Sequence, residues 1–311
     1  MSERVRVRSL AKINLDLRVL HRRPDGFHEL RTIFQTVSLA DTLDIEYQRG
    51  RTRIDIQSSL NIPGNIIEKA AHNVLAATGR SGRVGFVLHK NIPLGAGLGG
   101  GSSNAASVLL ALPALLGKPL PLPKLMELAA DLGSDVPFFL LGGTALGIGR
   151  GTELYPLPDL PTRLVLLVTP GIHVSTPEAY HALQRTSAQA ALPDTLREFQ
   201  SAAWRASGEH RNDFEEVVFR QHPQLKSIKG KLRKLGARPA LMSGSGSSVF
   251  GVFESRAARD RAAQALGKEF PGDQVHPATM VSRSRYRALW RRQLAGFWDS
   301  MLWPRQDRYV K

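Results

Sequence analysis

The feature that most constrains the fold of this chain is a glycine-rich stretch, Pro93-Leu-Gly-Ala-Gly-Leu-Gly-Gly-Gly-Ser-Ser-Asn-Ala-Ala106. Five of the seven residues from Gly95 to Gly101 are glycine. Glycines let several backbone N–H groups converge on one anion with no side chain in the way. The Ser/Asn cluster that follows can cap a helix, whose amino end carries partial positive charge. Such a loop suits a polyphosphate and indicates an enzyme that uses a nucleotide.

Two other phosphate-binding patterns fit this loop poorly. Its glycines match G-x-G-x-x-G, but the dinucleotide fold also requires an acidic residue about 20 positions later. No acidic residue follows the loop before Glu127. A Walker A loop ends in a lysine before Ser or Thr, whereas this loop ends Gly-Ser-Ser. The alternative to a phosphate-binding loop is a purely structural turn between a strand and a helix. Such a turn needs one or two glycines, whereas this stretch has five.

Length and composition favour a cytoplasmic protein of two domains. The 311 residues suffice for two domains. Cysteine is absent, which excludes a disulfide framework and cysteine metal sites and fits a reducing compartment. The amino terminus has no apolar stretch of signal-peptide length, and no run approaches the length of a membrane span. The net charge of +15 favours anionic partners without choosing among nucleotides, nucleic acid and a membrane surface.

Periodicity and turn residues predict alternating strands and helices. In the first half we expect strands at 5–9, 11–20, 43–47, 53–57 and 84–89, and helices at 65–77, 103–113 and 123–132. In the second half we expect strands at 164–168, 238–242 and 248–253, and helices at 176–184, 213–221, 225–235 and 255–266. Pro113 should end or kink its helix. A cluster of prolines at 156, 158 and 161 marks the expected domain boundary.

Three blocks of the sequence together resemble the superfamily of galactokinase, homoserine kinase, mevalonate kinase and phosphomevalonate kinase. They are the glycine-rich stretch, Ala11-Lys-Ile-Asn-Leu and Ser243-Gly-Ser-Gly-Ser-Ser-Val-Phe. The resemblance covers about residues 6–285. It implies an α+β, two-domain small-molecule kinase fold with the active site in the cleft between the domains. The expected parts are a nucleotide-binding domain (1–158), a ferredoxin-like substrate domain (159–282) and a basic aromatic tail (283–311).

The resemblance is stronger to one branch of this superfamily. It rests on Asp25-Gly-Phe-His-Glu-Leu, the triple glycine at 99–101, and Leu132-Gly-Ser-Asp-Val-Pro-Phe-Phe-Leu-Leu-Gly-Gly. This branch implies ATP-dependent phosphorylation of the 2-hydroxyl of a cytidine diphosphate derivative of methylerythritol, in non-mevalonate isoprenoid biosynthesis. One alternative is a kinase of another small alcohol, such as homoserine or mevalonate. The other is a basic RNA-binding module that stacks bases on aromatic side chains, although the aromatics lack a repeated sheet pattern. We expect no nucleic-acid partner.

The resemblance implies that Asp135 and Lys12 are the catalytic residues. From the residues alone, Asp135 would be a helix cap or turn residue, and Lys12 would face outward from a strand. The resemblance implies instead that Asp135 is the general base that takes the proton of the attacking hydroxyl. Lys12 would lie beside it and stabilise charge on the transferring phosphoryl group. Asn14 lies two residues further on, so it faces the same side as Lys12 and would orient the substrate.

The resemblance also implies a pocket for the cytosine. Phe27 and His28 would otherwise be surface turn residues; here they would hold the base by stacking and hydrogen bonding. The family more often has tyrosine at position 27, so this chain keeps the stacking surface and loses a phenol hydrogen bond. Tyr180 would form the opposite aromatic wall, or would pack within a helical core. Thr176 is placed with the substrate as well.

The residues expected to bind ATP lie in and around the glycine-rich stretch. They are Asn65, Lys90, Pro93, Leu94, Gly95, Ala96, Gly97, Leu98, Gly99, Gly100, Gly101, Ser102 and Ser103. Ser103 could contact a phosphate or Mg²⁺, cap the following helix, or do both. Gly244 and Gly246 would let a backbone turn approach the substrate closely. We expect Mg²⁺ to be held mainly by ATP and water, because no cluster of carboxylates marks a site built by the protein.

The carboxy-terminal segment 283–311 is basic and aromatic. Tyr286, Trp290, Phe297, Trp298 and Trp303 are interleaved with arginines, and apolar residues recur at helical spacing. We favour a helix that packs on the body of the protein. The alternative is an amphipathic helix that contacts a membrane surface or a partner.

Overall fold

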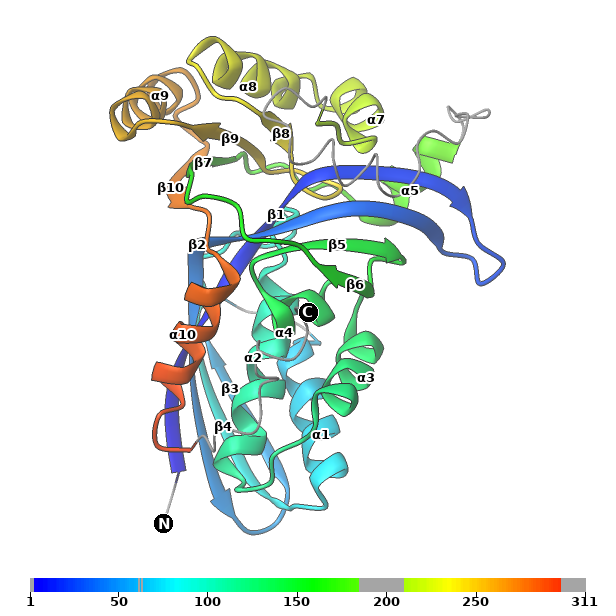
Figure 1. Ribbon diagram of the computed structural model, residues 1–311, viewed down its shortest axis with the longest axis vertical. Coiled ribbons are helices and arrows are strands. Elements are labelled where there is room, and N and C mark those ends of the chain that lie inside the picture. Colours follow the sequence, from blue (N-terminus) through cyan, green and yellow to red (C-terminus); the bar gives the residue numbers. More distant parts are fainter. Residues whose placement is uncertain (1–2, 61, 63, 185–209, 298–311) are drawn as a thin grey trace.

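The protein is built on two β-sheets that lie one above the other along its long axis (Figure 1). The computed structural model describes residues 3–60, 62, 64–184 and 210–297. The first sheet has the strand order β3-β4-β2-β5-β6, with β1 paired to β2. The second has the order β10-β7-β9-β8.

A long antiparallel hairpin supplies the two longest strands of the first sheet. It consists of β1 (Glu3–Arg22) and β2 (His28–Arg49). The other strands are β3 (Arg53–Ser58), β4 (Gly82–His89), β5 (Thr144–Gly149) and β6 (Glu153–Pro156). The strands expected at 5–9 and 11–20 are therefore one strand, whose register shifts at Leu10/Ala11 without interrupting it. The first half of β2 was not predicted, because buried polar residues such as Thr32, Gln35 and Thr36 obscure its alternation.

Four helices cover one face of this sheet (Figure 1). They are α1 (Ile66–Thr78), α2 (Gly100–Leu115), α3 (Leu122–Leu132) and α4 (Val136–Leu141). Helix α2 begins three residues earlier than expected, directly after Gly99 in the left-handed conformation, and it continues two residues past Pro113. Pro113 lies inside the last turn of a helix that is buried on nearly all sides, so tertiary packing outweighs the local cost of the proline.

The second sheet is antiparallel throughout and has a β-α-β-β-α-β chain order. Its strands are β7 (Leu164–Thr169), β8 (Ala240–Met242), β9 (Val249–Phe253) and β10 (Gln274–Thr279). Its helices are α5 (Thr176–Gln184), α7 (Phe214–Gln221), α8 (Pro223–Lys234) and α9 (Arg256–Glu269). This is the expected ferredoxin-like arrangement. The change of sheet falls between β6 and β7, at the proline cluster; the domain limits 1–158 and 159–282 stay our proposal.

The described part of the carboxy-terminal segment packs on the first domain, as expected. Helix α10 (Arg283–Gln293) places Tyr286 and Trp290, each 1% exposed, in the hydrophobic core with α2 and α4. The Tyr286 hydroxyl donates a 2.6 Å hydrogen bond to the Phe139 carbonyl. Trp298 and Trp303 lie outside the described residues. Within the described ranges, no helix is both long and apolar enough to cross a bilayer.

The turn end of the hairpin connects the two sheets. The Leu17 N–H donates to the Arg211 carbonyl at 2.9 Å, and the Asp213 N–H donates to the Leu17 carbonyl at 3.0 Å. Apolar residues of β1 and β2 share one buried cluster with residues of β7, β9 and β10. The hairpin therefore places residues 12–30 at the junction of the two halves (Figure 1).

Candidate active site

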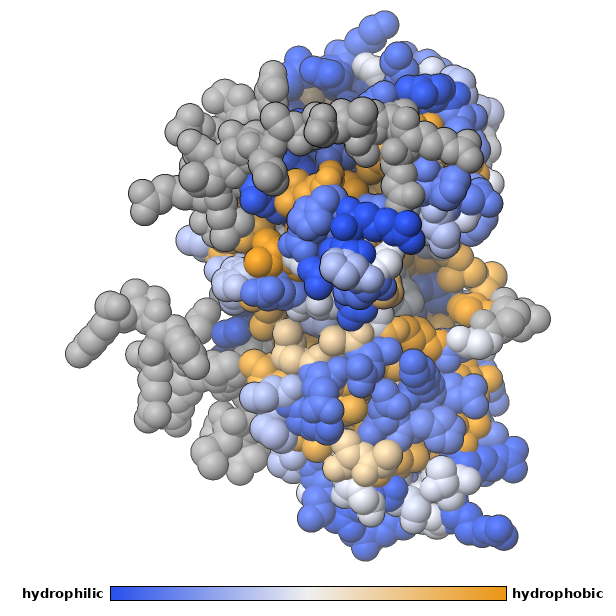
Figure 2. Space-filling view, turned by 90° about the vertical axis from the view of Figure 1, so that its right-hand side faces the viewer, coloured by the Kyte–Doolittle hydropathy of each residue, from blue (hydrophilic) through white to orange (hydrophobic). Residues whose placement is uncertain are grey.

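A cavity of about 1000 Å³ lies at this junction. It is lined by the hairpin, the glycine-rich loop, the start of α4, the β5–β6 turn, the start of α5 and the turn at 244–246. Figure 2, which faces the side toward which the hairpin turn projects, shows hydrophilic residues over both halves and hydrophobic patches between them. The active site was expected in this cleft.

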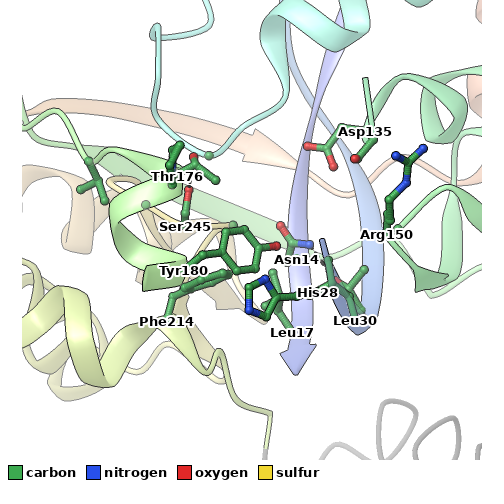
Figure 3. A pocket seen from close by; sticks show the side chains of 18 of the residues that line it. Asn14, Leu17, His28, Leu30, Asp135, Arg150, Thr176, Tyr180, Phe214 and Ser245 are labelled. Carbon is green, nitrogen blue, oxygen red and sulfur yellow. Dashed lines mark hydrogen bonds between the residues drawn. The ribbon is translucent and has the colours of Figure 1, made fainter. Parts of the chain in front are cut away.

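Lys12 and Asp135 meet in the cavity. Lys12 Nζ lies 3.2 Å from Asp135 Oδ2 and also donates to Asn14 Oδ1 at 2.7 Å. The lysine side chain is 4% exposed and the aspartate side chain 32% exposed, so the outward-facing interpretation of Lys12 is wrong. Asp135 occupies the cap position of α4 but makes no capping hydrogen bond. Its carboxylate is therefore open to a ligand in the cavity, on one side of Asn14 (Figure 3).

A chain of buried hydrogen bonds fixes Asn14. Its amide nitrogen donates to Thr32 Oγ1 at 2.7 Å, and that hydroxyl donates to the Asp16 carbonyl at 2.8 Å. Both ends of the Asn14 amide thus have partners, one from β1 and one from β2. The side chain is held in one orientation at the cavity wall, as an orienting residue requires.

Asp16, at the end of this chain, gives a pH-dependent prediction. Burial raises its pKa to about 6 from the ordinary 3.8, and the charge of Arg18 opposes the rise only in part. Because Asp16 then binds more protons in the folded than in the unfolded state between these values, its contribution to the free energy of unfolding falls as pH rises from about 4 to 6. Asp16→Asn should gain stability relative to the wild type by up to roughly 3 kcal/mol between pH 4 and pH 7.5. Urea unfolding at both pH values measures this.

The matched control is Asp44→Asn, on β2. Hydrogen bonding to Arg6 lowers the pKa of Asp44, so this variant should lose stability relative to the wild type as pH rises. An Asp16→Asn difference that is the same at pH 4 and pH 7.5 would contradict the assigned pKa.

The glycine-rich loop packs backbone to backbone against the second domain. Gly97 has a φ of +75°, and a Cβ built on it would lie 2.0 Å from the Ser243 carbonyl oxygen. Ser243 Oγ donates to the Gly97 carbonyl at 2.9 Å, and the Ser248 N–H donates to the Ala96 carbonyl at 3.1 Å. Gly244 and Gly246 line the cavity, as expected, and the turn that carries them also approaches the loop.

The loop offers the cavity its backbone rather than its side chains. Gly95, Gly97, Gly99 and Ser102 line the cavity. Ala96 and Leu98 are buried in the core, and Leu94 is half exposed. Pro93, Gly100 and Gly101 lie in the same loop and at the start of α2 but do not line this cavity.

Ser103 does not cap α2. Gly99 occupies the cap position, and Ser103 is buried in the first turn with no hydrogen-bond partner for its hydroxyl. An unpartnered buried hydroxyl beside a phosphate loop fits a contact to phosphate or to a phosphate-bound cation. Within the described part of the chain, no group of three or more His, Cys, Asp or Glu side chains could hold a metal ion.

Asn65 and Lys90 lie beside the loop but outside the main cavity. Asn65 caps α1, accepting from the Ile67 N–H at 3.1 Å, and it lines a separate hollow of about 480 Å³ with residues of β3. Ile66, the next residue along the chain, contacts the start of α2, because its Cγ2 lies 3.9 Å from where a Cβ on Gly101 would be. The Lys90 ammonium pairs with Asp41, and the lysine side chain is 2% exposed.

Aromatic rings form the other end of the cavity. The His28 and Tyr180 rings stack with centroids 4.8 Å apart, and Tyr180 packs edge-on against Phe214. Tyr180 therefore lines the cavity and also packs against a hydrophobic core, so the predicted core packing is confirmed, and its role as a wall for the base stays a prediction. No base fits between His28 and Tyr180 at this spacing. Figure 3 shows this aromatic group across Asn14 from Asp135.

Burial governs the protonation of both rings. It lowers the pKa of His28, with a smaller effect from Arg22, so the imidazole is neutral at pH 7 and can both donate and accept a hydrogen bond. Burial, and then the charge of Asp135, raises the pKa of Tyr180, so its phenol keeps its proton.

Sequence reasoning missed Arg150 and Ser245. The Arg150 guanidinium lies 4.6 Å from the centroid of the Phe27 ring, which is 50% exposed, and both residues line the cavity. The available signal was an arginine between Gly149 and Gly151, at a turn between two strands that were not predicted. Ser245 shares a 2.7 Å hydroxyl–hydroxyl hydrogen bond with Thr176, which joins the expected substrate residue to the glycine turn.

Comparisons with known proteins agree with this architecture. Residues 65–143 match the family model of the GHMP kinases N terminal domain, and residues 189–272 match that of the GHMP kinases C terminal domain. A protein of Solibacter usitatus (strain Ellin6076) named 4-diphosphocytidyl-2-C-methyl-D-erythritol kinase is 54% identical over an alignment of 310 residues that covers 97% of each chain. The chain belongs to the 4-diphosphocytidyl-2-C-methyl-D-erythritol kinase family.

Other members and structures support this family assignment. A kinase of the same name from Thermus thermophilus is 43% identical over 261 residues, covering 82% of this chain and 90% of that protein. A crystal structure of 4-(cytidine 5'-diphospho)-2C-methyl-D-erythritol kinase superposes with a TM-score of 0.75 at 40% identity, covering 90% and 99% of the two chains. Homoserine kinase from Cytophaga hutchinsonii, at 21% identity and a TM-score of 0.69, shares the fold.

The predicted superfamily, fold and class of enzyme are thereby confirmed. The chain is an ATP-dependent phosphotransferase of the GHMP kinases. The predicted kinase of the cytidine branch is supported over the homoserine, mevalonate and RNA-binding alternatives.

Proposed function

We propose that this chain transfers the γ-phosphoryl group of ATP to the 2-hydroxyl of 4-diphosphocytidyl-2-C-methyl-D-erythritol. One observation carries the proposal: a single cavity is bounded by the glycine-rich loop, by the Lys12–Asp135 pair and by the aromatic group at His28. A phosphate donor, a base and a surface for a nucleobase thus lie within reach of one bound acceptor.

In this reaction Asp135 removes the proton of the acceptor's hydroxyl as the oxygen attacks the γ-phosphorus. Lys12 keeps the carboxylate paired in the free enzyme at 3.2 Å and offers its positive charge to the phosphoryl oxygens. Asn14, fixed by Lys12 and Thr32, orients the methylerythritol end.

The triphosphate binds at the amino end of α2. The loop backbone at Gly95, Gly97 and Gly99 and the hydroxyls of Ser102 and Ser103 contact its phosphates, and the partial positive charge of the helix stabilises them. The hollow at Asn65 takes the base end of ATP, because Ile66, the residue after Asn65, contacts the start of α2 at Gly101. A bound Mg²⁺ would neutralise the charge that develops on the phosphates, and the hydroxyl of Ser103, which is buried without a hydrogen-bond partner, would help to hold it.

The cytidine end of the acceptor binds at the aromatic group. Phe27 offers a stacking face backed by Arg150, and the neutral His28 offers hydrogen bonds to the edge of the base. Tyr180 lies at the end of the pocket. A hydrogen bond with Ser245 orients the hydroxyl of Thr176, which contacts the substrate. We further propose that the enzyme works in the cytoplasm, in keeping with a cysteine-free sequence, and that it needs no nucleic-acid partner.

A coupled assay of ADP formation over a panel of acceptors tests this function. With ATP and Mg²⁺, the cytidine substrate should give rapid turnover, and homoserine and mevalonate should give none above background. Omission of Mg²⁺ should abolish turnover. Turnover with homoserine or mevalonate in place of the cytidine substrate would overturn the assigned acceptor.

Substitution of Phe27 tests the cytosine site. Phe27→Leu should raise the KM for the cytidine substrate by about 10- to 100-fold, because a base–aromatic stack contributes roughly 1–3 kcal/mol. The KM for ATP should not change. Since the ring is half exposed, the fold should be unaffected. Tyr155→Leu is the control, because Tyr155 is similarly exposed but lies outside the cavity; equal effects of the two changes would refute the stacking role.

A further inference from the structure

Asp41 is a fully buried carboxylate to which neither the sequence nor the proposed reaction gave a role. It lies on β2 opposite Ser9 of β1, at 0% exposure and outside the catalytic cavity. A buried charge of this kind is costly unless it is paired and hydrogen-bonded. Its environment therefore has to supply several donors.

Four donors converge on this carboxylate. Oδ1 accepts from the backbone N–H groups of Asn91 at 2.7 Å and Ile92 at 2.8 Å. Oδ2 accepts from Asn104 Nδ2 at 3.1 Å and from the Lys90 ammonium, which is itself buried. Charge-assisted hydrogen bonds of this kind are the strong ones.

The four donors lie on both sides of the glycine-rich loop. Lys90, Asn91 and Ile92 come directly before it, and Asn104 comes directly after it, in the first turns of α2. A loop of about ten residues, rich in glycine, has large conformational freedom unless its ends are fixed. Asp41 holds both ends on one side chain.

The same cluster extends under the start of α2. Lys90 Nζ lies 3.0 Å from where a Cβ on Gly100 would be. The glycine at 100 therefore leaves the space through which the lysine reaches Asp41. The position of the helix end that receives the phosphates thus depends on the Lys90–Asp41 pair.

We propose that Asp41 is a positioning residue for ATP, acting through Lys90, Asn91, Ile92 and Asn104 to hold the glycine-rich loop in the conformation that binds the triphosphate. The inference rests on the proposed function of that loop. In this proposal Lys90 acts on ATP binding indirectly, by pairing with Asp41 and so helping to hold the loop backbone in place. The inference also predicts that loss of Asp41 impairs the ATP side of the reaction and spares the acceptor side.

The test uses the full chain with Asp41→Asn, which keeps the shape and removes the charge. The KM for ATP should rise by about 10- to 100-fold, as expected when a reacting group is misplaced from a distance. The KM for the cytidine substrate should stay within about twofold, since its pocket makes no contact with Asp41. Hydrogen exchange at the amides of residues 94–103 should become faster in the variant without nucleotide.

Two further variants keep the test decisive. Asp44→Asn changes another ion-paired aspartate on β2 that makes no hydrogen bond to the loop, so it should leave the KM for ATP unchanged. Asn104→Ala removes the hydrogen bond to Asp41 from the residue that follows the loop, and it leaves the Lys90–Asp41 pair intact. It therefore replaces Asp41→Asn in the test if that variant fails to fold. It should raise the KM for ATP in the same direction.

The outcomes separate the two proposals. If a non-hydrolysable ATP analogue slows exchange at 94–103 in the wild type, but neither Asp41→Asn nor Asn104→Ala changes the KM for ATP, the role of Asp41 is refuted. A lower melting temperature with unchanged KM values would also refute it. If the analogue does not slow exchange there in the wild type, the proposed ATP site itself fails.

Discussion

Asp135→Ala is expected to lower kcat by about 10²- to 10⁴-fold while ATP still binds, because the variant loses the proposed general base and keeps the phosphate loop. Lys12 would retain its hydrogen bond to Asn14 and so its place in the cavity. Steady-state ADP formation measures the loss, and calorimetric titration with ATP measures binding.

The control for Asp135 is Asp131→Ala. Asp131 lies on α3, close in sequence, is exposed and does not line the cavity. This variant should keep full activity. Full turnover in Asp135→Ala would remove the proposed base, and loss of ATP binding would assign the residue to the ATP site rather than to proton transfer.

Gly97→Ala should have the largest effect among changes that remove no functional group. The added methyl would meet the Ser243 carbonyl oxygen at 2.0 Å and the Gly246 carbonyl oxygen at 3.0 Å, and the residue has a φ of +75°. Because both contacts are with backbone, either the loop or the turn has to move. We expect a loss of about 3 kcal/mol in the free energy of unfolding and a fall in kcat of about 100-fold. Urea unfolding and the ADP assay measure the two effects.

Gly117→Ala separates the clash from the backbone strain. Gly117 has a φ of +59°, but a Cβ on it would meet nothing within 4 Å. This variant should lose about 1 kcal/mol of stability and keep its kcat. If Gly97→Ala behaved like Gly117→Ala, the close packing of the two glycine segments would not matter for catalysis.

Local sequence signals predicted the elements whose cause is itself local. Asn65 caps α1 where the helical pattern begins, and the proline cluster falls at the change of sheet. The first half of β2 escaped prediction because its inward side chains are polar, satisfied by partners far away in sequence such as Asn14 for Thr32. Helix α2 continues past Pro113 because it is buried on nearly all sides, and this burial cannot be recognised from a local stretch of sequence.

The residues of the site can be divided in the same way, into those that the sequence indicated and those that only the fold brings together. The phosphate loop was predicted from its glycines, whereas the roles of Lys12 and Asp135 came from a resemblance, and residue-level reasoning alone would have pointed Lys12 outward. Arg150 could not be predicted, because its position depends on a strand pair that was not recognised. The role of Asp41 could not be predicted for a different reason. Its hydrogen-bond donors at 90–92 and 104 lie about 50 or more residues away in the sequence, and only the fold brings them to one carboxylate.

The central claim is that the loop backbone holds the triphosphate and aims its terminal phosphate at an alcohol beside Asp135. A crystal structure with a non-hydrolysable ATP analogue and the cytidine substrate tests it most directly. The account predicts phosphates against the amides of residues 95–103, with the acceptor's 2-hydroxyl between the γ-phosphate and Asp135. An analogue bound elsewhere, with the loop making no contact to phosphate, would contradict it.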